Sequence, residues 1–159
     1  MKKWLAMMAV LVMAGAAAAQ APALTKFLHE FLVRDCGMAY KGQTEFGYTY
    51  VKRGQAVWFK VNHKGDVREG GTAITPSVNA SEAAEILYIV YATLQLNLGK
   101  KQILDKKIAI PKMFYLLDTI SANLKHDNKT KFRYDDLNVL ALKDPKTKLT
   151  LISFWPMWN

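Results

Sequence analysis

The alternation of apolar and polar residues follows a helical period most clearly over residues 79–99, NASEAAEILYIVYATLQLNLG. Ala83, Leu87, Val90 and Leu94 recur at intervals of three or four residues, as on one face of a helix. Further Ile and Tyr side chains lie between them and spread apolar surface around the segment. Because a helix that is apolar on nearly all sides must be covered on nearly all sides, we predict that residues 79–99 form a central core helix.

Both ends of this segment carry helix signals. Asn79 and Glu82 have the spacing of a capping box, and Gly99 can take the left-handed conformation that ends many helices. Residues 92–98, however, alternate strictly between apolar and polar side chains, which is typical of a strand. We predict a helix throughout, with a strand as the alternative for the last part.

The remaining pattern predicts two more helices and two β-hairpins. Residues 25–40 are amphipathic with a helical period, and residues 112–125 follow Pro111, a residue suited to the first turn of a helix. Residues 45–51 and 56–63 alternate around a turn that contains Gly54, residues 67–74 suit a short third strand, and residues 137–143 and 148–154 flank the turn sequence DPKT. We expect residues 41–44, 100–107 and 126–133 to be irregular. The predicted fold is therefore α+β, with about three helices packed on antiparallel strands arranged as two hairpins in a single compact domain.

Residues 1–19 have the organisation of a cleavable Sec-type secretory leader. Lys2 and Lys3 precede an apolar stretch over residues 4–15, and small residues follow at 17–19. We expect cleavage between Ala19 and Gln20, which leaves residues 20–159 as one exported domain in the periplasm or the medium, with no transmembrane anchor. Cys36 is far from the cleavage site, so a lipid anchor is not expected. The alternative is an uncleaved N-terminal anchor helix.

Positive charge is concentrated in the second half of the chain. Residues 100–159 contain 12 Lys and Arg against 6 Asp and Glu, whereas residues 20–99 contain 8 against 7. A basic half favours an acidic partner, and an exported protein is not expected to meet nucleic acid. The alternative is a solvated lysine-rich face that serves solubility.

Residues that could carry catalysis or bind a metal are few. His29, His63 and His126 lack the spacing of metal ligands, and neither a nucleophile-elbow motif nor a glycine-rich phosphate loop occurs. The single cysteine, Cys36, cannot form an internal disulfide, and we expect it to be buried near the C-terminal end of its helix. A helix C-terminus opposes thiolate formation, so a Cys–His nucleophile is the less favoured alternative. We expect no catalytic residue, no metal site and no cofactor.

Two neighbouring carboxylates, Asp135 and Asp136, are interpreted as turn residues before the last hairpin. If they lay on a strand, their side chains would point to opposite faces and could not act together. The candidates for a contact surface are instead the basic residues of the second half and the aromatic residues near the C-terminus, namely Lys125, Lys129, Lys131, Arg133, Lys146, Lys148, Trp155 and Trp158.

We therefore favour a non-enzymatic, protein-binding module of the bacterial envelope, in the form of an inhibitor or immunity protein that occludes an envelope-targeted hydrolase. One alternative is a carrier of a small ligand or lipid, with a cavity lined by Tyr88, Tyr91, Met113 and Phe114. The other is an envelope hydrolase with an unrecognised site. The oligomeric state is not predicted.

Overall fold

The computed structural model describes residues 24–157, which form one antiparallel sheet and three helices. The helices are α2 (Lys26–Glu30), continued by a π-helical turn over Phe31–Asp35, α3 (Ala80–Asn97) and α4 (Lys106–Asn123). The strands are β1 (Ala39–Thr44), β2 (Gly47–Lys52), β3 (Gln55–Val61), β4 (Val67–Ile74), β5 (Lys129–Tyr134), β6 (Leu137–Lys143) and β7 (Thr150–Pro156). The expected leader and Trp158 lie outside the described residues.

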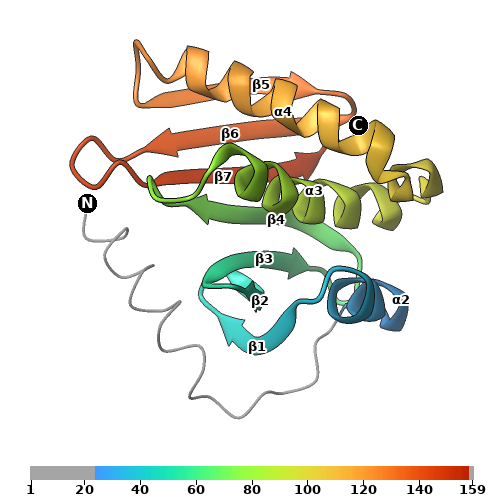
Figure 1. The fold of residues 1–159 in the computed structure, drawn as a ribbon. Helices are drawn as coiled ribbons and strands as arrows, with labels where there is room; N and C mark the ends of the chain where they lie inside the picture. Colours follow the sequence, from blue (N-terminus) through green and yellow to red (C-terminus); the bar gives the residue numbers. More distant parts are fainter. Residues whose placement is uncertain (1–23, 158–159) are drawn as a thin grey trace.

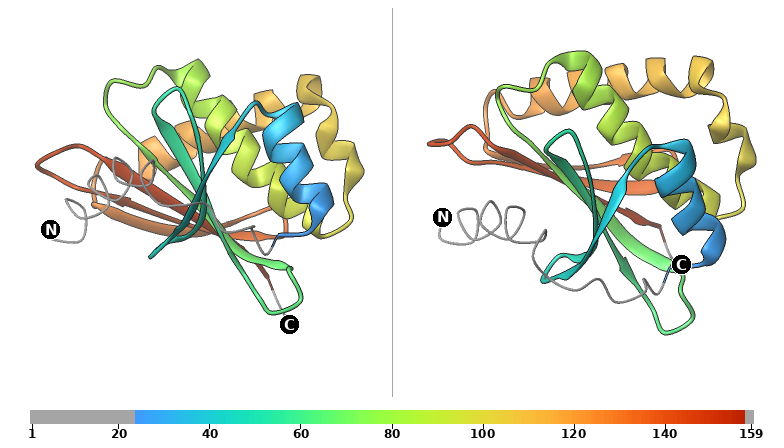
Figure 2. Two further views of the ribbon diagram at one scale, coloured as in Figure 1. Left: turned by 90° about the horizontal axis from the view of Figure 1, so that it is seen from below. Right: turned by 60° about the horizontal axis from the view of Figure 1, so that its bottom comes forward.

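The seven strands form one sheet in the order β1-β2-β3-β4-β7-β6-β5, and every neighbouring pair is antiparallel. The three helices all lie on one face of this sheet, and among residues 24–157 no helix lies over the opposite face (Figures 1 and 2). The predicted α+β single domain is confirmed, although the sheet has more strands than two hairpins supply. No helix between residues 24 and 157 is long and apolar enough to cross a membrane.

Helix α3 is the core element that the sequence predicts. Its capping box is formed, with the Glu82 N–H donating to Asn79 Oδ1 at 2.9 Å and the Asn79 N–H donating to Glu82 Oε2 at 3.4 Å. Nearly all its side chains from Ala83 to Leu96 are buried against the sheet and the other helices. Gly99, at φ +81°, allows the chain to leave the helix.

The polar residues that made residues 92–98 resemble a strand have specific partners in the helical form. The Thr93 hydroxyl donates to the Ile89 carbonyl at 2.7 Å, within the helix. The Asn97 side chain accepts from the Val67 N–H at 3.0 Å and donates to the Val67 carbonyl at 3.3 Å, which fixes the start of β4. The alternating polar residues 93 and 97 therefore form hydrogen bonds within the helix and with β4, and the prediction of a helix is confirmed.

The prediction of one helix over residues 25–40 is wrong at its C-terminal end. The helical segment stops at Asp35, because Gly37 adopts φ +68° and redirects the chain. Residues 39–44 then form β1, so the loop expected at residues 41–44 is also wrong. Tyr40 pairs with Tyr50 of β2, and a bulge follows between Tyr40 and Gly42.

Two further boundaries differ from the prediction because polar sequences form regular structure. Residues 101–104 form a 3₁₀ turn, and α4 begins at Lys106 with the Asp105 side chain accepting from the Lys107 N–H at 3.0 Å. Pro111 therefore lies inside α4 rather than in its first turn. Its missing N–H costs one helical hydrogen bond, and the helix continues past it with Met113 and Leu116 buried in the core.

The expected loop at residues 126–133 contains strand β5, the outermost strand on its side of the sheet. Thr130, Phe132 and Tyr134 are partly buried and alternate with three exposed basic residues. This alternation is a strand pattern, and the high positive charge of the segment concealed it.

A small apolar cluster lies on the face of the sheet opposite the three described helices. Trp58 is 2% exposed there and packs with Ala73 and Leu149, with Phe46 beside it at a ring-centroid distance of 5.3 Å. The Trp58 indole covers Gly71 of the neighbouring strand so closely that a Cβ at Gly71 would lie 2.6 Å from Trp58 Cε2. Glycine is therefore required at position 71 to admit the indole.

We predict that Gly71→Ala lowers the free energy of unfolding by about 1–3 kcal/mol, because the new methyl group overpacks the Trp58 contact. Chemical denaturation of both proteins measures the change. In a Trp58→Leu background the same substitution should cost less, since the smaller side chain leaves room for the methyl group. Equal costs in the two backgrounds would contradict this explanation.

Candidate functional site

The register of β5, β6 and β7 brings four of the predicted contact residues to one side of the sheet. Lys131 pairs with Leu140, and Leu140 pairs with Ser153 of β7. The adjacent rows of the same face are Lys129–Leu142–Leu151 and Arg133–Asn138–Trp155. Because side chains two residues apart share a face, the three basic residues of β5 and Trp155 project from the face opposite the described helices.

An apolar strip lies beside these cations. Leu140 and Leu142 of β6 and Leu151 and Trp155 of β7 are partly exposed on this face. Val139 and Ala141 of β6 and Ile152 and Phe154 of β7 are buried on the helical face. Lys131 Nζ is 5.5 Å from the centroid of the Trp155 ring, which is a cation–π distance. We call this surface the open-face patch, and its residues are Lys129, Lys131, Arg133, Leu140, Leu142, Leu151 and Trp155.

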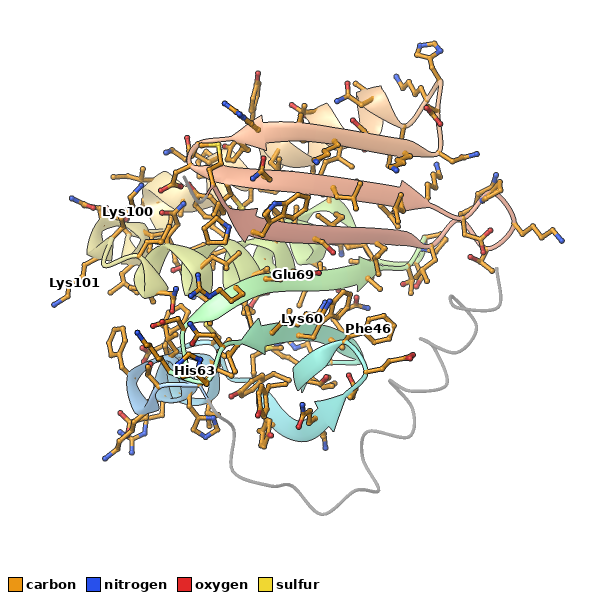
Figure 3. The ribbon with its side chains drawn as sticks, turned by 180° about the vertical axis from the view of Figure 1, so that it is seen from behind. Phe46, Lys60, His63, Glu69, Lys100 and Lys101 are labelled. Carbon is orange, nitrogen blue, oxygen red and sulfur yellow. The ribbon has the colours of Figure 1, made fainter. Side chains whose placement is uncertain are left out.

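A shallow hollow of about 410 Å³ adjoins Trp155 on this face. Leu140 and Ser153 form part of its floor, and Lys60 and Glu69 line it from β3 and β4. Figure 3 views the molecule from this side, with Lys60 and Glu69 on neighbouring strands. Their ion pair has an Nζ–Oε2 distance of 3.2 Å. The apolar strip thus has basic residues along β5 and a mixed-charge rim across the sheet.

The remaining predicted cations lie at one end of the patch. Lys125 follows α4 in the turn that leads to β5, whereas Lys146 and Lys148 are exposed at the tip between β6 and β7. The Lys143 N–H donates to the Asn128 carbonyl at 2.8 Å, so this tip and the start of β5 are at the same end of the sheet. Trp158 cannot be placed, because it lies outside the described residues.

The predicted cations are available for a partner. Within residues 24–157, no ion pair involves Lys125, Lys129, Lys131, Arg133, Lys146 or Lys148. The Asp144 carboxylate at the hairpin tip forms hydrogen bonds within its own turn, because it accepts from the Lys146 N–H at 3.0 Å and from the Thr147 hydroxyl at 2.8 Å. The positive charge of this surface is therefore not neutralised by its own acidic neighbours.

Leu140, Leu142, Leu151, Lys60 and Glu69 were not among the sequence candidates. The first three are apolar residues at strand spacing, which a sequence pattern does not distinguish from core residues. Their exposure follows from the position of the three described helices, which all lie on the other face of the sheet (Figure 2).

Cys36 has the buried position that the sequence predicts. It is 5% exposed and ends the π-helical turn, and its carbonyl accepts from Lys52 Nζ at 2.9 Å. Burial raises the pKa of the thiol to about 11, with a smaller opposing effect from Lys106. The thiol is therefore protonated near neutral pH, which is unfavourable for a nucleophile.

The histidines are placed apart from any metal-ligating arrangement. His29 Nδ1 lies 2.8 Å from the Tyr50 hydroxyl inside an aromatic cluster with Tyr40, and His63 and His126 are exposed. In the part of the chain that the structure describes, no three His, Cys, Asp or Glu side chains are arranged to hold a metal ion.

Asp135 and Asp136 are turn residues, as the sequence predicts. Both are in the turn between β5 and β6, where Asp135 adopts φ +52°, and both side chains reach residues of the helical layer. The Tyr91 hydroxyl donates to Asp135 Oδ2, and Gln95 Nε2 donates to Asp136 Oδ1 at 2.6 Å. Lys100 forms an ion pair with Asp136. Side chains of neighbouring residues point to opposite faces only on a strand. Because Asp135 and Asp136 are in a turn, both side chains can point toward the helices.

These contacts change the acidities of the groups. Burial alone would raise the pKa of Asp136, but the hydrogen bonds from Lys100 and Gln95 outweigh it and hold the pKa below its ordinary value. Burial and the hydrogen bond with Asp135 raise the pKa of Tyr91. Tyr91 is therefore a neutral donor to a carboxylate across the physiological range.

The cavity proposed for a carrier has a different lining from the one expected. Tyr88 and Met113 are buried in the core, and Phe114 is an exposed residue of α4. Tyr91 does line a cavity, but its neighbours there include Asp135 and Asp136.

Comparison of this chain with protein-family models, with curated proteins and with solved structures found no match.

We predict that native Cys36 reacts with DTNB at neutral pH about a hundredfold more slowly than the same thiol in guanidinium chloride, because it is protonated and buried. Absorbance at 412 nm follows both reactions. Rapid stoichiometric labelling of the native protein would show instead that the thiol is accessible and ionised.

We also predict that Asp136 contributes to stability in a pH-dependent manner. Its folded pKa is below its unfolded pKa, so the contribution is present above the unfolded value and is lost as the pH falls through the folded value. Unfolding free energies of the wild type and Asp136→Asn should therefore converge as the pH falls below about 4. Asp118→Asn, at an exposed position of α4, controls for loss of one carboxylate. A difference between the wild type and Asp136→Asn that is constant with pH would contradict the assignment.

Proposed function

We propose that this chain is a protein-binding module of the bacterial envelope that docks an acidic surface of a partner protein against the open-face patch. The observation that carries the proposal is the gathering of Lys129, Lys131, Arg133 and Trp155 on a sheet face that no described helix covers. Unpaired cations beside exposed apolar side chains match the composition of many interfaces, in which an apolar centre has a polar rim.

The patch suggests how recognition is divided between its parts. Trp155 is partly exposed, and its ring is held beside Lys131, so it can enter a partner's cleft with little loss of side-chain freedom. Lys129 and Arg133 flank it along β5 and can pair with carboxylates at the rim of that cleft. Leu140 and Leu142 supply apolar area between them.

Within this proposal, the specific role that we favour is that of an inhibitor or immunity protein. A rigid sheet face that carries an aromatic anchor and basic neighbours can occlude the cleft of an envelope-targeted hydrolase without any chemistry of its own. The leader expected over residues 1–19 supports export to the compartment in which such a target acts.

The experiment is recovery of the tagged protein from the periplasm of its native host, followed by mass spectrometry and an assay of the recovered partner for hydrolysis. A photo-crosslinking residue in place of Leu140 should form a covalent adduct with the partner. The same residue in place of Tyr115, an exposed position of α4 on the other side of the sheet, should not. Adducts from position 115 alone would overturn the assignment of the face, and recovery of a small molecule instead of a protein would favour the carrier.

We predict that Lys131→Glu combined with Arg133→Glu weakens binding of the partner at least about tenfold and that moderate salt weakens wild-type binding, because both treatments remove charge attraction. Calorimetry or surface plasmon resonance with the identified partner measures the affinities. Lys101→Glu combined with Lys107→Glu makes the same change in net charge on the helical side and should have little effect. Equal losses in the two double variants would indicate a non-specific effect of net charge.

A further inference from the structure

A second cavity lies on the helical side of the sheet, away from the open-face patch. It has a volume of about 430 Å³ and is bounded by the C-terminal half of α3, the 3₁₀ turn, the start of α4 and the turn between β5 and β6. This volume is within the range of small-molecule sites. The proposed protein-binding function makes no use of it.

The cavity wall carries charges of both signs in equal number. Asp135 and Asp136 supply two carboxylates, and Lys100 and Lys112 supply two ammonium groups. The Lys112 Nζ is 3.7 Å from Asp135 Oδ2, and the two side chains are 47% and 42% exposed. Such a loose, solvated pair contributes little to stability, so a ligand can separate it at small cost.

A buried polar group in the same wall lacks a partner. Gln95 is 2% exposed and lines the cavity, and its Oε1 has no hydrogen-bond partner among the described residues. Its Nε2 donates to Asp136 at 2.6 Å, so rotating the amide by 180° would instead set two acceptors against each other. The orientation is therefore fixed, and Gln95 holds Asp136 at the cavity wall while its own Oε1 is buried without a hydrogen-bond partner among the described residues.

The cavity also has an apolar side. Ile103 and Ala109 contribute to its wall, and Ile108 is 60% exposed at its margin. Exposure of so large an apolar side chain beside a charged cavity is consistent with a ligand that has an apolar body.

We propose that this cavity binds a small zwitterion with an apolar side chain, of the class of free amino acids and short peptides. The ligand's ammonium group donates to Asp135, and its carboxylate accepts from Lys112. Its side chain packs on Ile103 and Ile108. A ligand with one charge alone would form only one of these two charge-assisted contacts.

The test is NMR titration of the isotope-labelled protein with three probes of the same apolar body. L-Leucine carries both charges, isopentylamine the ammonium group alone, and 4-methylpentanoate the carboxylate alone. L-Leucine should bind with saturable shifts at Gln95, Lys112 and Asp135, and each analogue should bind at least about tenfold more weakly, because it lacks one charge-assisted contact. No saturable binding of L-leucine or of L-leucyl-L-leucine up to about 10 mM would overturn the proposal, as would equal affinity for the three probes.

Two variants assign the binding to this cavity. Lys112→Ala removes an exposed side chain, and Asp135→Asn retains a residue type that tolerates the left-handed backbone at this position. Each should weaken L-leucine binding at least about tenfold, since each loses a charged partner. Lys107→Ala, on the same helix but outside the cavity wall, is the matched control. Unchanged affinity in both cavity variants would overturn the proposal.

Discussion

The side chains of α3 are withdrawn from water on almost every side, and this burial fixes the positions of the elements around it. Its residues from Ala83 to Leu96 contact the sheet through β3, β4 and β7 and the helical layer through α2 and α4. Each large apolar side chain buried in this way contributes about 1.5–3 kcal/mol relative to an exposed one. With one cysteine in the chain, no internal disulfide can supplement this burial.

The C-terminal half of α3 also forms specific hydrogen bonds with two parts of the sheet. Tyr91 and Gln95 bond to the turn between β5 and β6, and Asn97 bonds to the first residue of β4. These contacts connect strands β1–β4 with strands β5–β7, the two parts of the sheet that α3 and α4 separate in the sequence. They also bring Asp135 and Asp136 beside Lys100, which forms the charged cavity as a by-product of how the helix is attached.

Elements with strong local signals could be predicted from the sequence, and elements defined by tertiary contact could not. The capping box at Asn79, the turn at Gly54 and the hairpin around residues 144–147 are local, and each is confirmed. Strand β1 was missed because it begins two residues after the glycine that stops the helix, and β5 was missed because its cations resemble a loop. Lys131 and Trp155 come together only through the pairing of β5, β6 and β7. The direction of the Asp135 side chain depends on the geometry of its turn. Residue spacing in the sequence predicts neither.

The position of β5 at the margin of the sheet has a consequence for how this surface can change in evolution. An outermost strand has unpaired backbone groups that can pair with another chain, and lysine and arginine side chains on such a strand hinder that association. Lys129, Lys131 and Arg133 are on this strand, so the charges that we propose for recognition would also hinder edge-to-edge pairing of two copies of the chain. A mutation that adapts this surface to a less acidic partner would therefore expose the sheet to self-association, and the surface is expected to drift more readily at Leu140 and Leu142 of β6 than along β5.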